Sequence, residues 1–294
     1  MSTPVAFAVV ALSSFAATWI ARRVAARAGF ADDPSQAPDR KRQSRPVPAV
    51  GGIAIVLGLA VAQALAWSAW IGIALAFLLG AIDDRRKGGL PPAALLFGQL
   101  VVAAGLVASG WRICGGPPVL AAGASALAVV VAINALNTFD NADGAATSIG
   151  VLGLGAGSPL LAAPLAGFLP WNLFASGSTR PAAYLGNAGS FVVGVLLLLD
   201  PIGRCALLLP LLDLARLVFV RTSAGSRPWI GDRRHLAHRM QAAGLATLPV
   251  VLALTAIAAP CVIGARIGGD AFLVGLLATV ALLVAAVVLT PAVE

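Results

Sequence analysis

The sequence predicts an all-α fold, a polytopic integral membrane bundle of about nine to eleven transmembrane helices. Of the 294 residues, 59% are hydrophobic and 11% are charged, whereas soluble proteins contain about 25% charged residues. The mean hydropathy of +0.93 requires a solvent other than water for most of the surface. Apolar runs recur from Pro4 to Val293 and leave no stretch for a separate soluble domain, so we expect one transmembrane domain over residues 1–294.

Composition also excludes other classes of protein. Cys114, Cys205 and Cys261 are too few and too far apart for a disulfide scaffold. The net charge of +8 would suit a nucleic-acid partner, but apolar spans separate the basic residues. We therefore expect no binding to nucleic acid.

Breakers between the apolar runs divide the chain into candidate helices, since roughly 20 helical residues cross a bilayer core. These segments lie near residues 4–21, 50–66, 67–82, 92–110, 119–139, 144–157, 158–169, 189–199, 202–220, 243–263 and 271–291. The middle four are interrupted. Residues 144–169 hold either one long helix or two short ones, and Asp200-Pro201 breaks the next stretch with the same ambiguity.

The basic residues predict the orientation. No Lys or Arg precedes the first apolar run, whereas Arg22, Arg23 and Arg27 follow it, which favours an outside N-terminus and an uncleaved first helix. If the segments alternate across the membrane, only three of the 20 Lys and Arg residues face outside, namely Arg112, Arg204 and Arg266. The positive-inside rule requires such a distribution.

In this orientation, the polar side chains collect on the cytoplasmic side. Asp83 and Asp84 end one apolar helix and point about 100° apart, so we expect them to divide labour rather than share one proton. The alternative is a solvated helix end balanced by nearby cations, although a helix C-terminus disfavours anions.

A second polar run ends the helix near 119–139. It contains Asn134, Asn137, Asp140, Asn141 and Asp143. Gly144 predicts that the helix ends around Asp140 and that the chain turns, which brings Asp143 back toward the others. Such residues are costly at the end of an apolar helix unless they line a wet cavity or bind a ligand. Capping of the next helix would explain one of them only.

Two further segments complete this side. Asp213 can pair with Arg216 at i+3, and a structural and a functional role both stay open. Residues 227–239 contain both histidines of the chain, His235 and His238, which are neighbours if helical. Together with Arg233 they suggest a diphosphate or nucleotide site, and a plain basic loop is the alternative. Carboxylates and amides opposite basic groups are suited to Mg²⁺-assisted phosphoryl transfer. A site at the interface further suggests a lipid substrate.

In this order, the segments resemble the polyprenyl-phosphate N-acetylhexosamine-1-phosphate transferases, which include undecaprenyl-phosphate GlcNAc-1-phosphate transferases and phospho-MurNAc-pentapeptide translocases. The resemblance covers residues 32–240. Its motifs are RKRQSRPVPAVGG at 40–52, DD at 83–84, NALNTFDNADG at 134–144, YLGNAGS at 184–190 and DRRHLAHR at 232–239. The last is similar to the DRxHxHH pattern of the GlcNAc-type branch and lacks the three consecutive histidines of the pentapeptide translocases.

The resemblance implies transfer of a sugar-1-phosphate from a UDP-sugar to undecaprenyl phosphate with release of UMP, which initiates cell-envelope glycan synthesis. It implies Mg²⁺, or alternatively Mn²⁺, as cofactor. The implied catalytic residues are Asp83, Asp84, Asp140 and Asp143, the substrate-binding residues are Lys41, Asn134, Arg233, His235 and His238, and the metal ligands are Asn137 and Asn187. The implied location is the bacterial inner membrane with a cytoplasmic active site, and a homodimer is one candidate assembly.

Departures from the family pattern keep other functions open. Asn187 stands where the family has an aspartate ligand, Gln43 replaces a histidine, and Ala237 replaces the middle histidine of the tail. A catalytically impaired homologue is therefore one alternative, and a non-enzymatic lipid-binding or transport protein is another. Intramembrane prenyltransferases space their acidic motifs by four rather than three, and the CDP-alcohol phosphotransferase pattern lacks its arginine and later acids here.

Overall fold

A computed structural model describes residues 2–28, 46–86, 88–174, 181–229 and 231–293. The helices are α1 (Thr3–Arg27), α2 (Gly51–Ala62), α3 (Trp67–Arg85), α4 (Pro92–Ala108), α5 (Pro118–Phe139), α6 (Ala145–Gly157), α7 (Pro159–Leu173), α8 (Gly186–Leu199), α9 (Gly203–Ala206), α10 (Leu208–Ser223), α11 (Leu236–Ala242), α12 (Thr247–Ile267) and α13 (Asp270–Leu289). Within the described ranges, the only strand-like pairing is an isolated parallel bridge between Ala49 and Tyr184. The all-α prediction is confirmed.

Several helices are suited to a bilayer. α1, α3, α5, α12 and α13 are long and apolar enough to cross it, and α2, α4, α6 and α8 are shorter apolar helices. The protein is therefore a multi-pass membrane protein, and the number of helices that span the bilayer stays a prediction.

In the interrupted middle of the chain, the structure has two short helices rather than one long one. Two helices, α6 and α7, occupy residues 144–169 and meet at Ser158. Pro159 begins α7, a position where its missing N–H costs nothing. The break at Asp200-Pro201 ends α8 and is followed by the single turn of α9. The short helix α11, in the histidine-containing segment, was not among the predicted helices.

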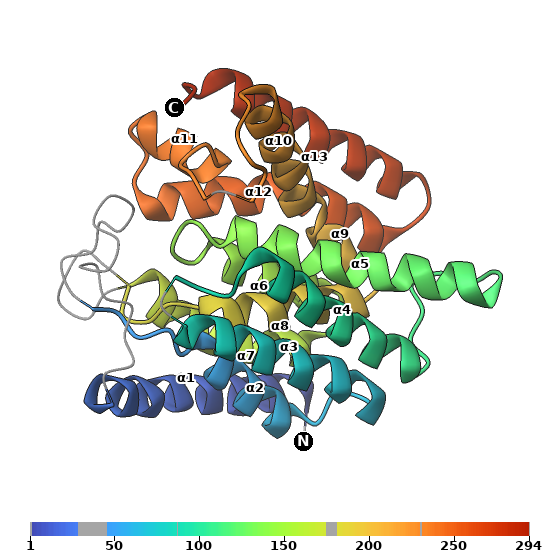
Figure 1. Ribbon diagram of the computed structural model, residues 1–294. Coiled ribbons are helices and arrows are strands. Elements are labelled where there is room, and N and C mark those ends of the chain that lie inside the picture. Colours follow the sequence, from blue (N-terminus) through green and yellow to red (C-terminus); the bar gives the residue numbers. More distant parts are fainter. Residues whose placement is uncertain (1, 29–45, 87, 175–180, 230, 294) are drawn as a thin grey trace.

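Helix α8 lies at the centre of the bundle. It packs against α2, α3, α5 and α6, and every residue from 188 to 198 is buried. Helices α1, α2 and α7 lie on one side of it, and α12 and α13 lie on the far side (Figure 1). Gly80 allows the close approach of α3, since a Cβ there would lie 2.4 Å from the backbone nitrogen of Ala188. This contact brings the last turn of α3 to the first turn of α8.

Candidate active site

The two adjacent aspartates of α3 have different partners. Asp83 is buried, and its Oδ1 accepts the backbone N–H of Leu90 at 2.5 Å, while its Oδ2 accepts a hydrogen bond from the side-chain Nδ2 of Asn187. Asp84 accepts the backbone N–H groups of Asn187 at 2.9 Å and Ala188 at 3.0 Å. Asp84 therefore caps the first turn of α8, where the helix dipole favours an anion. The two carboxylates thus contact different groups of Asn187, and a division of labour between them stays a prediction.

Asp83, Asn187 and Asn137 form a chain of hydrogen bonds that we call the amide relay. Nδ2 of Asn137 donates to Oδ1 of Asn187 at 2.7 Å and to Oγ of Ser190 at 3.2 Å. An ionised carboxylate only accepts hydrogen bonds, so Asn187 must present Nδ2 to Asp83 and Oδ1 to Asn137. In this arrangement Asn187 uses its amide within the relay, and Oδ1 of Asn137 is the amide oxygen left for a ligand.

The turn after α5 brings in two more carboxylates. α5 ends at Phe139, and Gly144, with φ of 85°, starts α6. This positive φ favours glycine, because L side chains rarely adopt that backbone conformation. The turn that Gly144 predicted is confirmed. Burial, and to a smaller extent repulsion from Asp143 and Asp84, raises the pKa of Asp140 to about 8. Asp84, Asp140 and Asp143 therefore form one electrostatically coupled group, which we call the acidic cluster.

The histidine segment contacts the end of this turn. His235 is buried at the start of α11, and its Nδ1 lies 2.9 Å from Nδ2 of Asn141, which donates. The rings of His235 and His238 are 5.5 Å apart at 80°, so the two are neighbours as expected. Burial, followed by the charges of His238 and Arg221, lowers the pKa of His235 to about 3. His235 is therefore neutral at pH 7, and its 3.9 Å approach to Asp213 is not an ion pair.

No protein-family model matches the chain. An Escherichia coli (strain K12) protein named undecaprenyl-phosphate alpha-N-acetylglucosaminyl 1-phosphate transferase is 26% identical over 289 residues, which cover 82% of this chain and 77% of the relative. The Yersinia pestis protein of that name is 28% identical over 303 residues, covering 88% and 82%. A Streptomyces coelicolor protein named as a glycosyltransferase is 34% identical over 295 residues, covering 80% and 66%.

The chain belongs to the polyprenyl-phosphate N-acetylhexosamine-1-phosphate transferases. Side chains from four of its five motif segments meet in the structure. The end of α3, the end of α5 and the start of α8 are joined by the amide relay and by Asp84. The histidine segment joins them through Asn141.

Not every predicted residue of the transferase lies in this group. Asn134 pairs with Gln99 of α4, with Nδ2 of Asn134 donating to Oε1 of Gln99 at 2.7 Å. Gln99 is 1% exposed, so this pair satisfies two amides inside the bundle. Arg233 and His238 line a separate cavity of about 490 Å³ at the start of α12. Lys41 and Gln43 lie outside the described residues.

The histidine segment is held by residues of α10, of which sequence reasoning missed one. Arg221 is buried and donates to both carboxylate oxygens of Asp232 at 3.0 Å and to the carbonyl of Pro228 at 2.9 Å. Asp213 does pair with Arg216, at 2.7 Å, as predicted. Arg216 also donates to the carbonyl of Arg234 at 2.6 Å. These bonds fix the backbone that presents His235.

The donor set of the transferase is compatible with Mg²⁺. Among the described residues, no group of three or more His, Cys, Asp or Glu could hold a metal ion. Mg²⁺ commonly uses one or two carboxylates and completes its shell with substrate phosphates and water. Repulsion from Asp143 and Asp84 contributes to the raised pKa of Asp140. A cation there would relieve that repulsion.

The pKa of Asp140 predicts an unusual dependence of stability on pH. Because its folded-state pKa of about 8 exceeds the ordinary aspartate value of 3.8, folding favours the protonated form. This contribution is complete below pH 3.8 and is lost as pH rises through 8. We therefore compare the melting temperatures of Asp140→Asn and the natural protein by thermal shift in detergent with a chelator present. The difference, variant minus natural protein, should increase between pH 6 and pH 9. A difference that does not change with pH would contradict the prediction, and added Mg²⁺ should reduce it.

Proposed function

We propose that the protein transfers N-acetylglucosamine-1-phosphate, or a related sugar-1-phosphate, from a UDP-sugar to undecaprenyl phosphate and releases UMP. The observation that carries this proposal is the meeting of four distant segments at one end of the bundle, with carboxylates and amides beside a histidine segment. The choice of acceptor lipid and sugar in this proposal follows the names of the relatives from Escherichia coli and Yersinia pestis. The proposed role is initiation of a cell-envelope glycan, at the cytoplasmic face of the bacterial inner membrane.

In the proposed reaction, an oxygen of the lipid phosphate forms a bond to the sugar-linked phosphorus of the donor. The bond from that phosphorus to the bridging oxygen breaks, and UMP leaves with that oxygen. Nδ1 of neutral His235 faces Nδ2 of Asn141, and its Nε2 lies 3.5 Å from Nη2 of Arg221, so His235 is proposed to position these two side chains beside the diphosphate. His238 and Arg233 are proposed to add positive charge or hydrogen-bond donors around the diphosphate.

The acidic cluster would repel a diphosphate without a cation. Mg²⁺, when bound, would neutralise charge on the diphosphate of the donor and on the departing UMP. We propose Asp140, Asp143 and Oδ1 of Asn137 as the groups that hold it. Asp83 is proposed to hold the relay in place, and Asp84 to fix the start of α8. Asn187 would become a metal ligand only if its amide turned away from the relay.

The test is UMP release by the purified protein in detergent with Mg²⁺, undecaprenyl phosphate and UDP-N-acetylglucosamine. We expect equal amounts of UMP and lipid-linked sugar diphosphate, and no UMP when the lipid is omitted. Absence of UMP with several UDP-sugars would reject the proposed transfer. Specific retention of the lipid in that case would favour an impaired homologue or a lipid-binding protein.

Asn187→Asp tests the relay directly. In the metal-free protein, a carboxylate at position 187 would face the carboxylate of Asp83, which the amide now contacts. We expect a lower melting temperature than that of the natural protein in chelator. Mg²⁺ should raise the variant's melting temperature more than the natural protein's, and the variant should need less Mg²⁺ for half-maximal rate.

Ser223→Asp is the matched control for this variant. It adds the same charge at an exposed position at the end of α10. We expect it to leave the Mg²⁺ requirement unchanged. Equal responses of the two variants would remove position 187 from the neighbourhood of the ion.

A further inference from the structure

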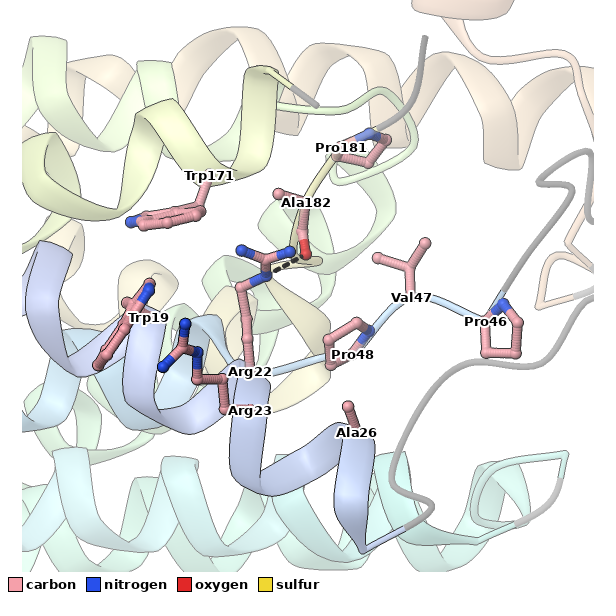
Figure 2. A pocket seen from close by; sticks show the side chains of 10 residues that line it. All are labelled: Trp19, Arg22, Arg23, Ala26, Pro46, Val47, Pro48, Trp171, Pro181 and Ala182. Atoms are coloured by element: carbon pink, nitrogen blue, oxygen red, sulfur yellow. Dashed lines mark hydrogen bonds between the residues drawn. The ribbon is translucent and has the colours of Figure 1, made fainter. Parts of the chain in front are cut away.

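A second cavity lies at the C-terminal end of α1. It has a volume of about 430 Å³ (Figure 2). Its principal walls are Trp19, Arg22 and Arg23 of α1, Trp171 of α7, and the segments 46–48 and 181–182. The motif at 40–52 contributes Pro46, Val47 and Pro48 to its lining, and none of the described residues implied as catalytic lines it.

Both arginines of this cavity are held by neighbouring groups. Nε of Arg22 donates to the carbonyl of Ala182 at 2.6 Å, and its guanidinium lies 4.7 Å from the ring centre of Trp171. The guanidinium of Arg23 lies 3.7 Å from the ring centre of Trp19. Stacking on an aromatic face restricts a long side chain while keeping its charge. The described lining residues contribute two positive charges and no carboxylate, so the cavity is suited to an anion.

The position of the cavity along α1 indicates the kind of anion. α1 is a 25-residue apolar helix long enough to cross the membrane. Trp19, Arg22 and Arg23 lie in its last turns, where tryptophan and arginine mark the boundary between hydrocarbon and head groups. Basic pockets between transmembrane helices at this height bind lipid head groups, and a guanidinium is well matched to phosphate oxygens.

We propose that this cavity binds the phosphate group of a membrane lipid in the leaflet at the C-terminal end of α1. Both an anionic phospholipid and a polyprenyl phosphate carry that group, and their shared chemistry is what Arg22 and Arg23 recognise. The site is separate from the acidic cluster and does not depend on the proposed transfer reaction.

The cavity is nevertheless connected to the candidate active site through the backbone. The N–H of Tyr184 donates to the carbonyl of Pro48 at 3.0 Å, and the N–H of Gly51 donates to the carbonyl of Tyr184 at 3.1 Å. Two residues later the chain enters α8, whose first turn Asp84 caps. The short paired segment therefore forms a wall of the lipid-phosphate cavity and leads directly into α8.

The test measures lipid binding to the purified full-length protein by native mass spectrometry. The probes are phosphatidylglycerol, undecaprenyl phosphate, diacylglycerol as a lipid without phosphate, and inorganic phosphate. Arg22→Gln/Arg23→Gln should weaken binding of the phosphate-bearing lipids by about tenfold or more. The single variant Arg23→Gln, at an exposed position, should weaken binding of these lipids by a smaller factor. It provides the test if the double variant fails to fold.

Arg27→Gln is the matched control. It removes an exposed charge one turn further along α1 and outside the cavity lining, and we expect lipid affinity within about twofold of the natural protein's. Weakening of undecaprenyl phosphate alone would support the site and identify the polyprenyl lipid, and equal weakening of both lipids would support a general anionic-lipid site. Unchanged binding in the Arg22/Arg23 variants, an equal loss in Arg27→Gln, or inorganic phosphate binding as tightly as the lipids would overturn the proposal.

Discussion

Asp83→Asn should lower the rate of sugar-1-phosphate transfer by about 100-fold or more. The variant keeps an oxygen for the N–H of Leu90 but turns an NH₂ group toward Nδ2 of Asn187. Two donors then face each other, and Asn187 can escape only by turning its own amide. That turn would present Nδ2 of Asn187 to Nδ2 of Asn137. One substituted atom thus disrupts the whole relay, in addition to removing a buried charge.

The control for this variant is Asp270→Asn. Asp270 is an exposed aspartate in the first turn of α13, and its loss should leave the rate within about twofold of that of the natural protein. The assay is release of UMP at saturating donor, with the melting temperature measured in parallel to confirm folding. A folded Asp83→Asn variant that retained half of the natural rate would exclude the relay from the reaction.

Arg221→Ala should have the largest effect on stability. The buried guanidinium bonds both oxygens of Asp232 and the carbonyl of Pro228. Truncation leaves a partly buried carboxylate and a carbonyl without this donor. Because Asp232 keeps 24% of its side-chain exposure, we expect a loss of about 2–3 kcal/mol, at the lower edge of the range for broken buried ion pairs. This corresponds to a fall of roughly 5–10 °C in melting temperature.

Two companion variants separate geometry from charge. Arg221→Lys keeps the positive charge but cannot form the two parallel bonds to Asp232, so it should recover only part of the lost stability. Arg227→Ala removes an exposed arginine from the same segment and should change the melting temperature by less than about 2 °C. Equal falls in melting temperature for Arg221→Ala and Arg227→Ala would show that the buried hydrogen bonds of Arg221 add no stability beyond that of an exposed arginine.

The sequence predicted the fold and the approach of several polar segments to one another, because both depend on patterns along one chain. Apolar runs and the distribution of arginines assign helices and sides, and residues at helix ends on one side must lie near one another. Gly144 predicted its turn for an equally local reason, the need for a left-handed backbone. The pairing of Asp213 with Arg216 follows from helical spacing alone.

The missed contacts depend on which helices are neighbours. Asn187 meets Asp83 across 104 positions of sequence, and no local pattern shows that its amide will donate to a carboxylate. Gln99 is a single polar residue within an apolar run. This pattern predicts that its amide has a hydrogen-bond partner, but it does not identify Asn134 as that partner. Arg221 looks like an ordinary basic residue at a helix end until its burial is known.

The bonds from Asp84 and Asp83 to the start of α8 make α3 and α8 a single mechanical unit. Neither helix can slide or rotate against the other without breaking several short contacts at once. If the proposed reaction takes place, movements that admit the donor and release UMP must therefore arise elsewhere, and we expect them in the turn after α5 or in the segment that Arg221 holds. The joined helices α3 and α8 would then hold the groups that contact the reacting phosphates in constant positions throughout the proposed reaction.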